Sequence, residues 1–334
     1  MRVLGIDIGG TKIAAGVVDG ETGAVLYSER TPTVASEGGP AILARALAHA
    51  RHVAASANVP IDAVGIGAGG QIDYRSGVVL SATDILPGWA GTRLAEAFAE
   101  TFGVPAFADN DVNAFALGEH RFGAGRGATD AVFVALGTGV GGAIVTGGKL
   151  HRGKRGTGGE LGHMLFADFE SEFYYTFEEV TKGDRLADLY RTEAQNSSQF
   201  DGNRTSRKVR LSEPITGFAV GEEAKRNPGG DAAWVVEQLA RDLGIGLASL
   251  ANILDTERFV IGGGLADLGE LLLEPARKEF GENALPIFRD TPIVAAELGT
   301  NSSVVGAACV ALVGLVDREA ATLGIERFSG DAVD

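Results

Sequence analysis

A unit made of a strand, a glycine turn and a second strand occurs twice in this chain and constrains its fold more than any other feature. Shifting the sequence by 128 positions places Gly9 on Gly137 and Gly20 on Gly148, with apolar segments flanking each turn. Apolar runs on both sides of a glycine turn are typical of a β-hairpin. Two hairpins at a fixed offset predict an internal duplication, an α/β fold of two similar lobes with a cleft between them.

The rest of the chain alternates between helical and strand patterns. Helical spacing of apolar residues occurs at 41–57, 92–102, 112–122, 232–254, 268–280 and from 304 onward, and strand patterns occur at 63–68 and 258–262. We place the lobe boundary near residue 114, so that residues 1–114 and 302–334 form the N-terminal lobe and 115–301 the C-terminal lobe. The polar stretch 194–210 is predicted to be a loop or an insertion.

Composition excludes several classes of protein. With 334 residues, 45% of them hydrophobic, the chain can bury a large core. A net charge of −15 argues against a nucleic-acid partner, since phosphate binding takes clustered Lys and Arg. No signal-peptide pattern opens the sequence, and the longest apolar run, 304–316, is too short for a membrane span. We therefore expect a cytoplasmic protein with no membrane partner, in which that run is a buried helix.

The only cysteine, Cys309, lies inside this apolar run. A single cysteine excludes an internal disulfide and any zinc site built on several thiolates.

The first glycine turn, residues 7–12, has the composition of a phosphate-binding turn. Glycines let the backbone approach a ligand and present N–H groups to an anion, while Thr11 adds a hydroxyl and Lys12 a charge. Asp7 is placed to reach Mg²⁺ through water, because Mg²⁺ prefers oxygen ligands and keeps part of its hydration shell. An ordinary hairpin turn would explain one such segment, but its recurrence favours phosphate binding. The predicted phosphate-binding residues are Gly9, Gly10, Thr11, Lys12, Gly137, Thr138 and Gly139.

Two other nucleotide-binding interpretations of the glycines are weaker. Residues 137–142 match GxGxxG, but a strand follows where a dinucleotide-binding fold needs a helix. No GxxxxGK[ST] loop of a P-loop NTPase occurs. A third cluster, with Gly263 and Gly264, lies between a strand and a helix. It either lies against a flat ring or ribose or forms a tight strand-to-helix turn, and both interpretations stay open.

Polar residues that suit a hydroxyl substrate occur at two places. Asp109, Asn110 and Asp111 open the helix 112–122, and a helix N-cap explains one of them but not all three. A carboxylate in the first turn is kept ionised by the helix dipole, which suits a base that takes a proton from a hydroxyl as phosphorus is attacked. We assign that role to Asp111 and hydroxyl binding to Asn110.

Glu160 and His163 are three positions apart and share one face if their segment is helical. Glycines directly before Glu160 bring the backbone close, which suits an acceptor for ring hydroxyls. A surface pair with no ligand is the alternative.

Taken in order, these motifs resemble those of the ROK family of sugar kinases, which have the actin-like/hexokinase ATPase fold. The matching segments are residues 7–12, 67–73, 86–89, 110–119, 137–145, 159–164, 260–264 and 298–308. The resemblance implies ATP and Mg²⁺ as cofactors and a homo-oligomer, either a dimer or a tetramer. It implies phosphorylation of a hexose at the 6-hydroxyl, with glucose first and fructose, mannose, N-acetylglucosamine and N-acetylmannosamine as alternatives.

The resemblance also implies roles for single residues. Asp111 is the catalytic base, Asn110, Glu160 and His163 bind sugar hydroxyls, and Gly70 lies near the ring. A second sugar-binding glutamate precedes Gly183 in the family pattern. Glu178 takes that place, with the neighbouring Glu179 as the alternative.

The sequence departs from the family at the zinc site. Family members usually bind a structural zinc through the histidine of the GluXGlyHis motif and three cysteines just after it, and residues 164–177 contain no cysteine. We therefore expect no zinc, and we expect packing of Phe169, Phe173, Tyr174 and Tyr175 to order this loop instead. Gly69 also replaces a consensus proline, which predicts a more flexible turn.

Two functions from other classes remain as alternatives. A sugar-responsive repressor of the same family would need a helix-turn-helix segment before the first strand, and this chain starts at that strand. A noncatalytic actin-like assembly protein would leave Glu160 and His163 unexplained. The sequence leaves open which hexose is used and whether the phosphoryl donor is ATP, ADP or polyphosphate.

Overall fold

The computed structural model describes residues 1–168, 173–196 and 215–323. The chain forms two compact units. Unit 1 comprises Met1–Gly127, Leu150–Gly158 and Glu297–Asp334, and unit 2 comprises Ala128–Lys149 and Gly159–Ala296. A boundary at residue 114 would fall inside helix α3 (Asp111–Phe122), and the contacts keep this helix whole in unit 1.

Unit 1 contains a five-stranded sheet that begins with the predicted hairpin. Its order is β3 (Val25–Pro32), β2 (Lys12–Asp19), β1 (Arg2–Ile8), β4 (Ala63–Ala68) and β7 (Ala106–Asn110). The first three strands are antiparallel, and β4 and β7 run parallel to β1. Strands β1 and β4 are buried along nearly their whole length, as expected for strands covered on both faces. A two-stranded sheet of β5 (Gln71–Asp73) and β6 (Val78–Ser81) completes the strands of this unit.

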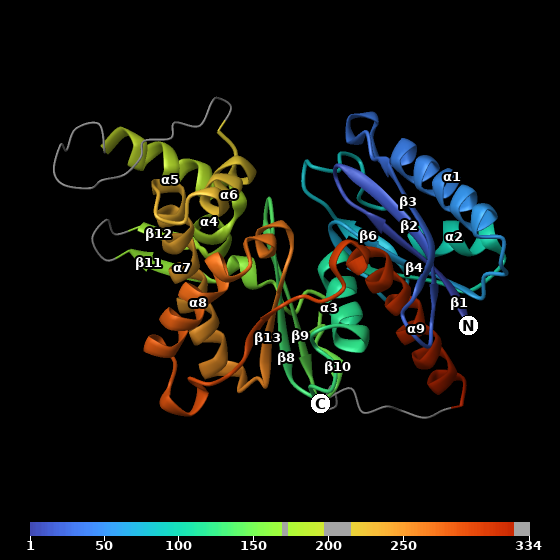
Figure 1. The fold of residues 1–334 in the computed structure, drawn as a ribbon. Helices are drawn as coiled ribbons and strands as arrows, with labels where there is room; N and C mark the ends of the chain where they lie inside the picture. The colour runs from blue at the N-terminus through green and yellow to red at the C-terminus, as the bar shows by residue number, and fades with distance from the viewer. Residues whose placement is uncertain (169–172, 197–214, 324–334) are drawn as a thin grey trace. The chain divides into compact units, whose positions relative to one another are not determined.

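Helices cover both faces of this sheet (Figure 1). On one face, α1 (Gly39–Ala57) and α2 (Leu94–Phe102) share a core with inward residues of β1, β2 and β4. On the other face, α3 packs with α9 (Ser302–Thr322) around a second core that includes Val3, Ala63 and Leu117. The sheet therefore holds the start of α3 next to the carboxyl ends of β1, β4 and β7.

Unit 2 repeats this plan. Its sheet has the order β10 (Lys149–Leu150), β9 (Val140–Thr146), β8 (Ala131–Leu136), β13 (Arg258–Gly262) and β14 (Ile293–Ala295). Strands β8 and β9 form an antiparallel hairpin, and β13 and β14 run parallel to β8. Since the strand order matches that of the first sheet, and so do the directions from β9 to β14, the predicted duplication is confirmed.

The helices of unit 2 bury a single large core, in which α7 supplies a continuous apolar face. The described α-helices of this unit are α4 (Phe177–Thr181), α5 (Gly183–Asn196), α6 (Gly217–Arg226), α7 (Asp231–Leu254) and α8 (Glu270–Asn283). A short hairpin of β11 (Leu165–Asp168) and β12 (Phe173–Thr176) precedes α4. Of the stretch 194–210, residues 194–196 end α5 and the rest lies outside the described residues.

Helix α9 is long and strongly apolar. Together with the short turn before it, it is long and hydrophobic enough to cross a membrane by length and composition, and half of its most apolar window is buried in the protein. Residues Val304 to Leu312 are all buried. This burial confirms the predicted buried helix for residues 304–312, whereas Val316 at the end of the predicted run is 42% exposed. Core helices of soluble proteins have the same composition.

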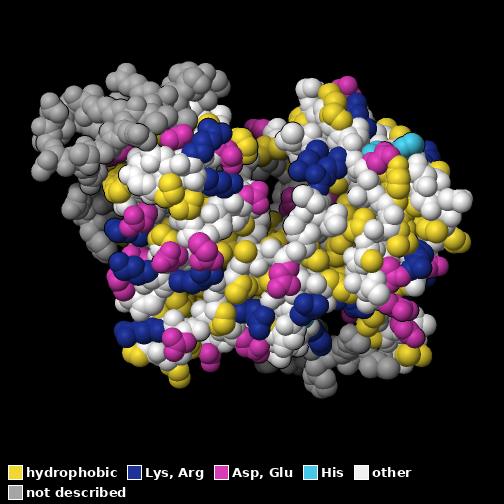
Figure 2. Space-filling view, viewed as in Figure 1, with side chains coloured by type: hydrophobic (Ala, Val, Ile, Leu, Met, Phe, Trp, Pro, Cys, Tyr) yellow, Lys and Arg dark blue, Asp and Glu magenta, His cyan; other side chains and the backbone are white. Residues whose placement is uncertain are grey.

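Acidic and basic side chains are interspersed on the visible face of the molecule (Figure 2).

Candidate active site

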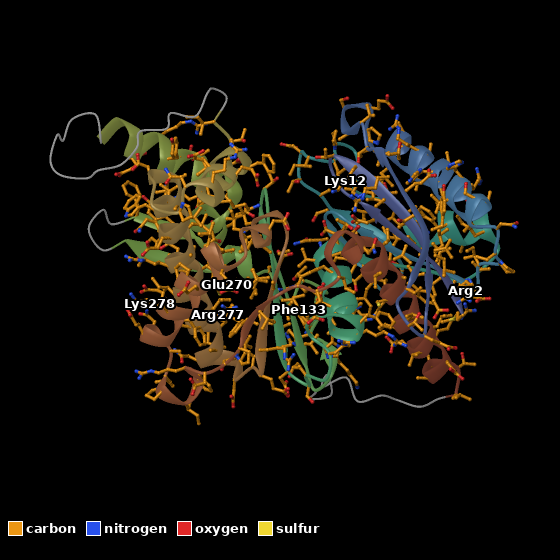
Figure 3. All side chains as sticks on the ribbon, in the orientation of Figure 1. Arg2, Lys12, Phe133, Glu270, Arg277 and Lys278 are labelled. Carbon is orange, nitrogen blue, oxygen red and sulfur yellow. The ribbon has the colours of Figure 1, made fainter. Side chains whose placement is uncertain are left out.

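The first glycine turn connects β1 to β2 and leaves backbone donors free. Thr33 is fully buried and stabilises the turn through two hydrogen bonds. Its N–H donates to the carbonyl of Thr11 (2.9 Å), and its hydroxyl donates to the carbonyl of Gly9 (2.6 Å). In the described part of the chain, the N–H groups of Gly10 and Thr11 have no partner. Lys12 is exposed at the start of β2 (Figure 3). This arrangement is what an anion-binding turn requires.

Asp7 and Asp111 lie near each other. Burial, and after it the carboxylate of Asp111, raise the pKa of Asp7 to about 7. Ser303, Lys12 and Arg30 act in the opposite direction, Ser303 by donating a hydrogen bond to Asp7. The fold thus brings together a residue predicted to serve Mg²⁺ and the residue predicted to be the base. Ser303 lies within a motif shared with the family, but its residue type alone gave no reason to assign it a role.

Asn110 caps helix α3. Its Oδ1 accepts hydrogen bonds from the N–H groups of Val112 (2.8 Å) and Asn113 (3.3 Å), and its Nδ2 donates to the carbonyl of Gly70 (2.9 Å). Both lone pairs of Oδ1 are therefore used, and one amide N–H remains. Asn110 can offer a ligand a donor and not an acceptor.

The half-buried Asp111 is the first residue of α3, and its Oδ2 points toward Gly69. A Cβ atom at position 69 would lie 4.0 Å from that oxygen. Gly69 donates its N–H to the carbonyl of Ile8 (3.1 Å), a bond that the family's proline lacks.

Asp109 is a residue of this region to which the sequence interpretation gave no role. It is 2% exposed, and its Oδ1 accepts hydrogen bonds from the N–H of Asn110 (2.8 Å) and from Nδ2 of Asn113 (2.9 Å). Its Oδ2 forms an ion pair with Arg152. The run of three polar residues hinted at Asp109, but nothing in the sequence pointed to Arg152, which is 43 positions away.

The second glycine turn connects β8 to β9 and lies against Glu178. The N–H of Gly137 donates to the carbonyl of Gly139 (2.9 Å), and Thr138 and Gly139 are exposed. Glu178 Oε2 accepts a hydrogen bond from the N–H of Val140 (2.8 Å). The adjacent Glu179 is engaged in a capping box with Thr176. Of these two glutamates, Glu178 is therefore the one beside a predicted site, and its role toward a sugar stays a prediction.

His163 ends one turn of 3₁₀ helix, and Glu160 is the N-cap residue of that turn; neither lies on an α-helix. The turn spans Leu161–His163, and the N–H of His163 donates to the carbonyl of Glu160 (3.2 Å). Glu160 is the residue directly before this turn and has a ψ of 63°, outside the helical range, so the pairing of the two side chains on one face stays a prediction. Both side chains are exposed and have no hydrogen-bond partner within the described ranges. They are free to bind a ligand.

The two glycines after β13, Gly263 and Gly264, differ in whether a larger residue would fit at their position. Gly263 has φ 82°, and a Cβ there would lie 2.3 Å from the carbonyl oxygen of Leu136, so only glycine fits. The tight-turn interpretation accounts for this residue. Gly264 is exposed, with no atom within 4 Å of a Cβ placed on it, so its surface is open to a ligand.

The prediction for the loop 164–177 is wrong in its packing. Phe173, Tyr174 and Tyr175 are 66%, 71% and 41% exposed, and Phe169 lies outside the described residues. A short two-stranded ribbon has little to cover its faces, so these aromatic rings stay in solvent. Pairing of β11 with β12 orders the segment instead, together with a stack of Phe166 on the buried Phe177 (centroids 5.7 Å apart). Within the described residues, no group of three or more His, Cys, Asp or Glu could hold a metal ion.

Comparison with known proteins decides the family. A profile described as "ROK family" matches residues 3–183 and 203–313. The chain belongs to the ROK family. One relative is a glucokinase from Streptomyces coelicolor. It is 35% identical to this chain, and the alignment covers 92% of this chain and 96% of the relative.

Solved structures agree with this ROK assignment. A ROK family glucokinase from Streptomyces griseus, in complex with glucose and AMPPNP, is 34% identical with a TM-score of 0.76, covering 94% of this chain and 100% of the other. A ROK hexokinase from Thermus thermophilus is 32% identical with a TM-score of 0.72, covering 95% and 100%. The fold is therefore that of the ROK hexokinases and glucokinases, as the resemblance implied.

Proposed function

We propose that this ROK protein is an ATP-dependent hexose kinase, with glucose as its principal acceptor and the 6-hydroxyl as the group phosphorylated. The observation that carries the proposal is the position of Asp111, a half-buried carboxylate at the N-terminus of α3 beside Asp7 and one residue from the capping Asn110. Similarity over almost the whole chain to proteins named glucokinase supports the choice of glucose.

In phosphoryl transfer, the protein itself forms no covalent intermediate in the proposed reaction. Phosphoryl transfer proceeds through a loose transition state, so positioning and charge stabilisation supply most of the catalysis. Asp111 accepts the proton of the sugar 6-hydroxyl while that oxygen attacks the γ-phosphorus. The remaining N–H of Asn110 donates to a sugar hydroxyl, and Glu160 accepts from another, with His163 beside it. The free N–H groups of Gly10 and Thr11 in the first glycine turn bind phosphate oxygens.

The residues at the first turn fit a magnesium ion. Asp7 is a half-buried carboxyl whose pKa is raised to about 7 by burial and by a second carboxylate, so a nearby cation would favour its ionised form. Mg²⁺ in kinases uses one or two carboxylates together with water and substrate phosphates, and Asp7 supplies that kind of ligand. When bound, the ion neutralises charge on the phosphates.

A substrate panel tests the proposed function. Purified protein is assayed with glucose, fructose, mannose, N-acetylglucosamine and N-acetylmannosamine, each with ATP, ADP or polyphosphate, with and without Mg²⁺. We expect glucose with ATP and Mg²⁺ to give the highest kcat/KM. Absence of turnover on every hexose would reject the proposal, and an Asp111→Asn preparation controls for a contaminating kinase.

We further propose that the protein is a cytoplasmic homo-oligomer, a dimer or a tetramer, without a nucleic-acid or membrane partner. Sedimentation velocity at several concentrations measures the oligomeric state, and a monomer at all of them would reject this part of the proposal. The same measurement with ATP tests for filaments, which a noncatalytic assembly protein would form.

A further inference from the structure

Arg152 joins two segments that carry predicted site residues. Its guanidinium forms an ion pair with Asp109, the residue directly before the capping Asn110. Its own backbone carbonyl accepts the N–H of Gly158 (2.8 Å) and so closes the turn 152–158, two residues before Glu160. All of these residues up to Gly158 belong to unit 1.

The surroundings of Arg152 hold its side chain in one orientation. The side chain is 15% exposed, against 2% for Asp109. The guanidinium lies over the ring of Tyr74, 4.3 Å from the ring centroid, a distance at which a cation is attracted to the face of an aromatic ring. Tyr74 also approaches the other end of the turn, since a Cβ at Gly156 would lie 4.0 Å from its Cδ1. Arg152 and Tyr74 together stabilise the position of the turn 152–158 within unit 1.

The pair is costly for stability alone. Both charges are removed from water, and Nε of Arg152 is buried with no acceptor in the described part of the chain. A buried ion pair often contributes no more stability than apolar side chains of the same size, and its best-attested benefit is a specific geometry. Here the geometry concerns Asp109, whose other oxygen holds the N–H of Asn110 and the side chain of Asn113.

We propose that Arg152 and Asp109 are positioning residues of the kinase, which set the start of α3, with Asn110 and Asp111, against the turn that leads to Glu160. Neither residue touches the reacting atoms in this proposal. Asp109 orients the base through the helix start, and Arg152 orients the sugar-binding segment through the turn. The inference rests on the proposed function for its kinetic consequences, and its geometric part is measurable without turnover.

A pair of variants separates the two roles. Arg152→Met leaves the buried Asp109 charge without its ionic partner. We expect kcat/KM for the sugar to fall about 100-fold, the size of loss that small displacements of catalytic groups cause. In the double variant Asp109→Asn/Arg152→Met, the Asn Oδ1 still accepts from Asn110 and Asn113 and no buried charge remains. We expect kcat to recover to within about threefold of wild type, while KM and the calorimetric Kd for glucose stay about tenfold raised.

This split between kcat and KM distinguishes positioning from a general loss of stability, which would change both together. Arg277→Met in α8 is the control, because it removes an arginine that pairs with Glu270 (2.6 Å; Figure 3) and lies far along the chain from Asp111 and from every predicted sugar-binding residue. Recovery of both constants in the double variant, or unchanged constants in Arg152→Met, would overturn the inference. Arg152→Lys, which keeps the charge, covers the case in which Arg152→Met does not fold.

Amide hydrogen exchange gives a readout that needs no activity. We expect Arg152→Met to speed exchange at Gly158, Asn110 and Val112, and Arg277→Met to leave these amides unchanged. If wild type phosphorylates no hexose yet these amides respond, the proposed function fails and the geometric part of the inference stands. If wild type is active and the amides do not respond, the inference fails and the proposed function stands.

Discussion

Asp7 is a carboxyl group that its surroundings hold partly protonated at neutral pH. The folded protein keeps this proton up to about pH 7, whereas an unfolded chain releases it near the ordinary value of 3.8. Because the native state then binds more protons than the unfolded state, Asp7 makes the free energy of unfolding fall as pH rises from about 4 to 7.

We therefore expect Asp7→Asn to be more stable than wild type above pH 7 in magnesium-free buffer, by about 1–3 kcal/mol. Below pH 4 the two proteins should be equally stable. Urea denaturation from pH 4 to 8 measures the difference, and titrating groups that do not interact with Asp7 cancel because both proteins carry them. A constant difference across this range would show that Asp7 ionises normally.

Asp111→Asn tests the base. The amide keeps the shape of the side chain but cannot take a proton, so kcat should fall by about 10²–10⁴-fold while the glucose Kd changes little. Single-turnover kinetics and calorimetry measure the two quantities. Asp188→Asn, at an exposed pair with Arg191 in α5, is the control and should keep the wild-type kcat. An unchanged rate in Asp111→Asn would place the proton transfer on another group.

At the residue scale, the sequence indicated groups that are close along the chain. Asn110, recognised there as a hydroxyl-binding candidate, also proves to be the helix cap, because capping residues precede a helix in sequence. Thr33, Ser303 and Arg152 were missed because their contacts join distant segments, and no local pattern reports such contacts.

At the scale of elements, the segment around β11, β12 and α4 shows how a loop without cysteines is ordered. The N–H of Phe177 donates to the carbonyl of Met164 (2.7 Å), Phe166 stacks on Phe177, and Glu178 follows directly with its bond to the second glycine turn. This short set of contacts connects the turn that bears His163 to the helix that bears Glu178.

Phe166→Ala should therefore lower the free energy of unfolding by about 2 kcal/mol, less than a fully buried phenylalanine because Phe166 is half-buried. Phe173→Ala, at the 66% exposed ring of the same hairpin, should change it by less than about 0.5 kcal/mol. Urea denaturation compares the two variants. Equal losses would mean that the exposed rings order the loop after all.

The long helices and the paired strands were predictable because their periodicity extends over many residues. The predicted helices 41–57, 112–122 and 232–254 agree with α1, α3 and α7 to within two residues at each end. The arrangement of the short hairpin was not predictable, since four-residue strands carry almost no periodic signal and their exposure depends on what packs over them.

At the scale of the whole molecule, Glu119 connects parts of the chain that are far apart in sequence. Its carboxylate is fully buried and accepts hydrogen bonds from the N–H groups of Ala124 (2.9 Å), Glu297 (3.0 Å) and Leu298 (2.9 Å). Ala124 lies just before the chain leaves unit 1, and Glu297 is where the chain returns to it. The Glu119 side chain thus stabilises both the segment where the chain leaves unit 1 and the segment where it returns to that unit.

We expect Glu119→Gln to lower the free energy of unfolding by about 2–4 kcal/mol, because its NH₂ group would face backbone donors inside the protein. Glu96→Gln, at an exposed pair with Arg93 (2.8 Å), should cost less than about 0.5 kcal/mol. Denaturation midpoints in urea give both values. A Glu119→Gln protein as stable as wild type would show that water replaces the lost acceptor.

The path of the chain limits how this protein can be divided. It passes from one unit to the other at four points, 127/128, 149/150, 158/159 and 296/297. Neither unit is an uninterrupted stretch of sequence. A gene split at any single codon would leave at least one fragment with an incomplete unit, so no single continuous fragment of the chain is expected to yield either unit whole.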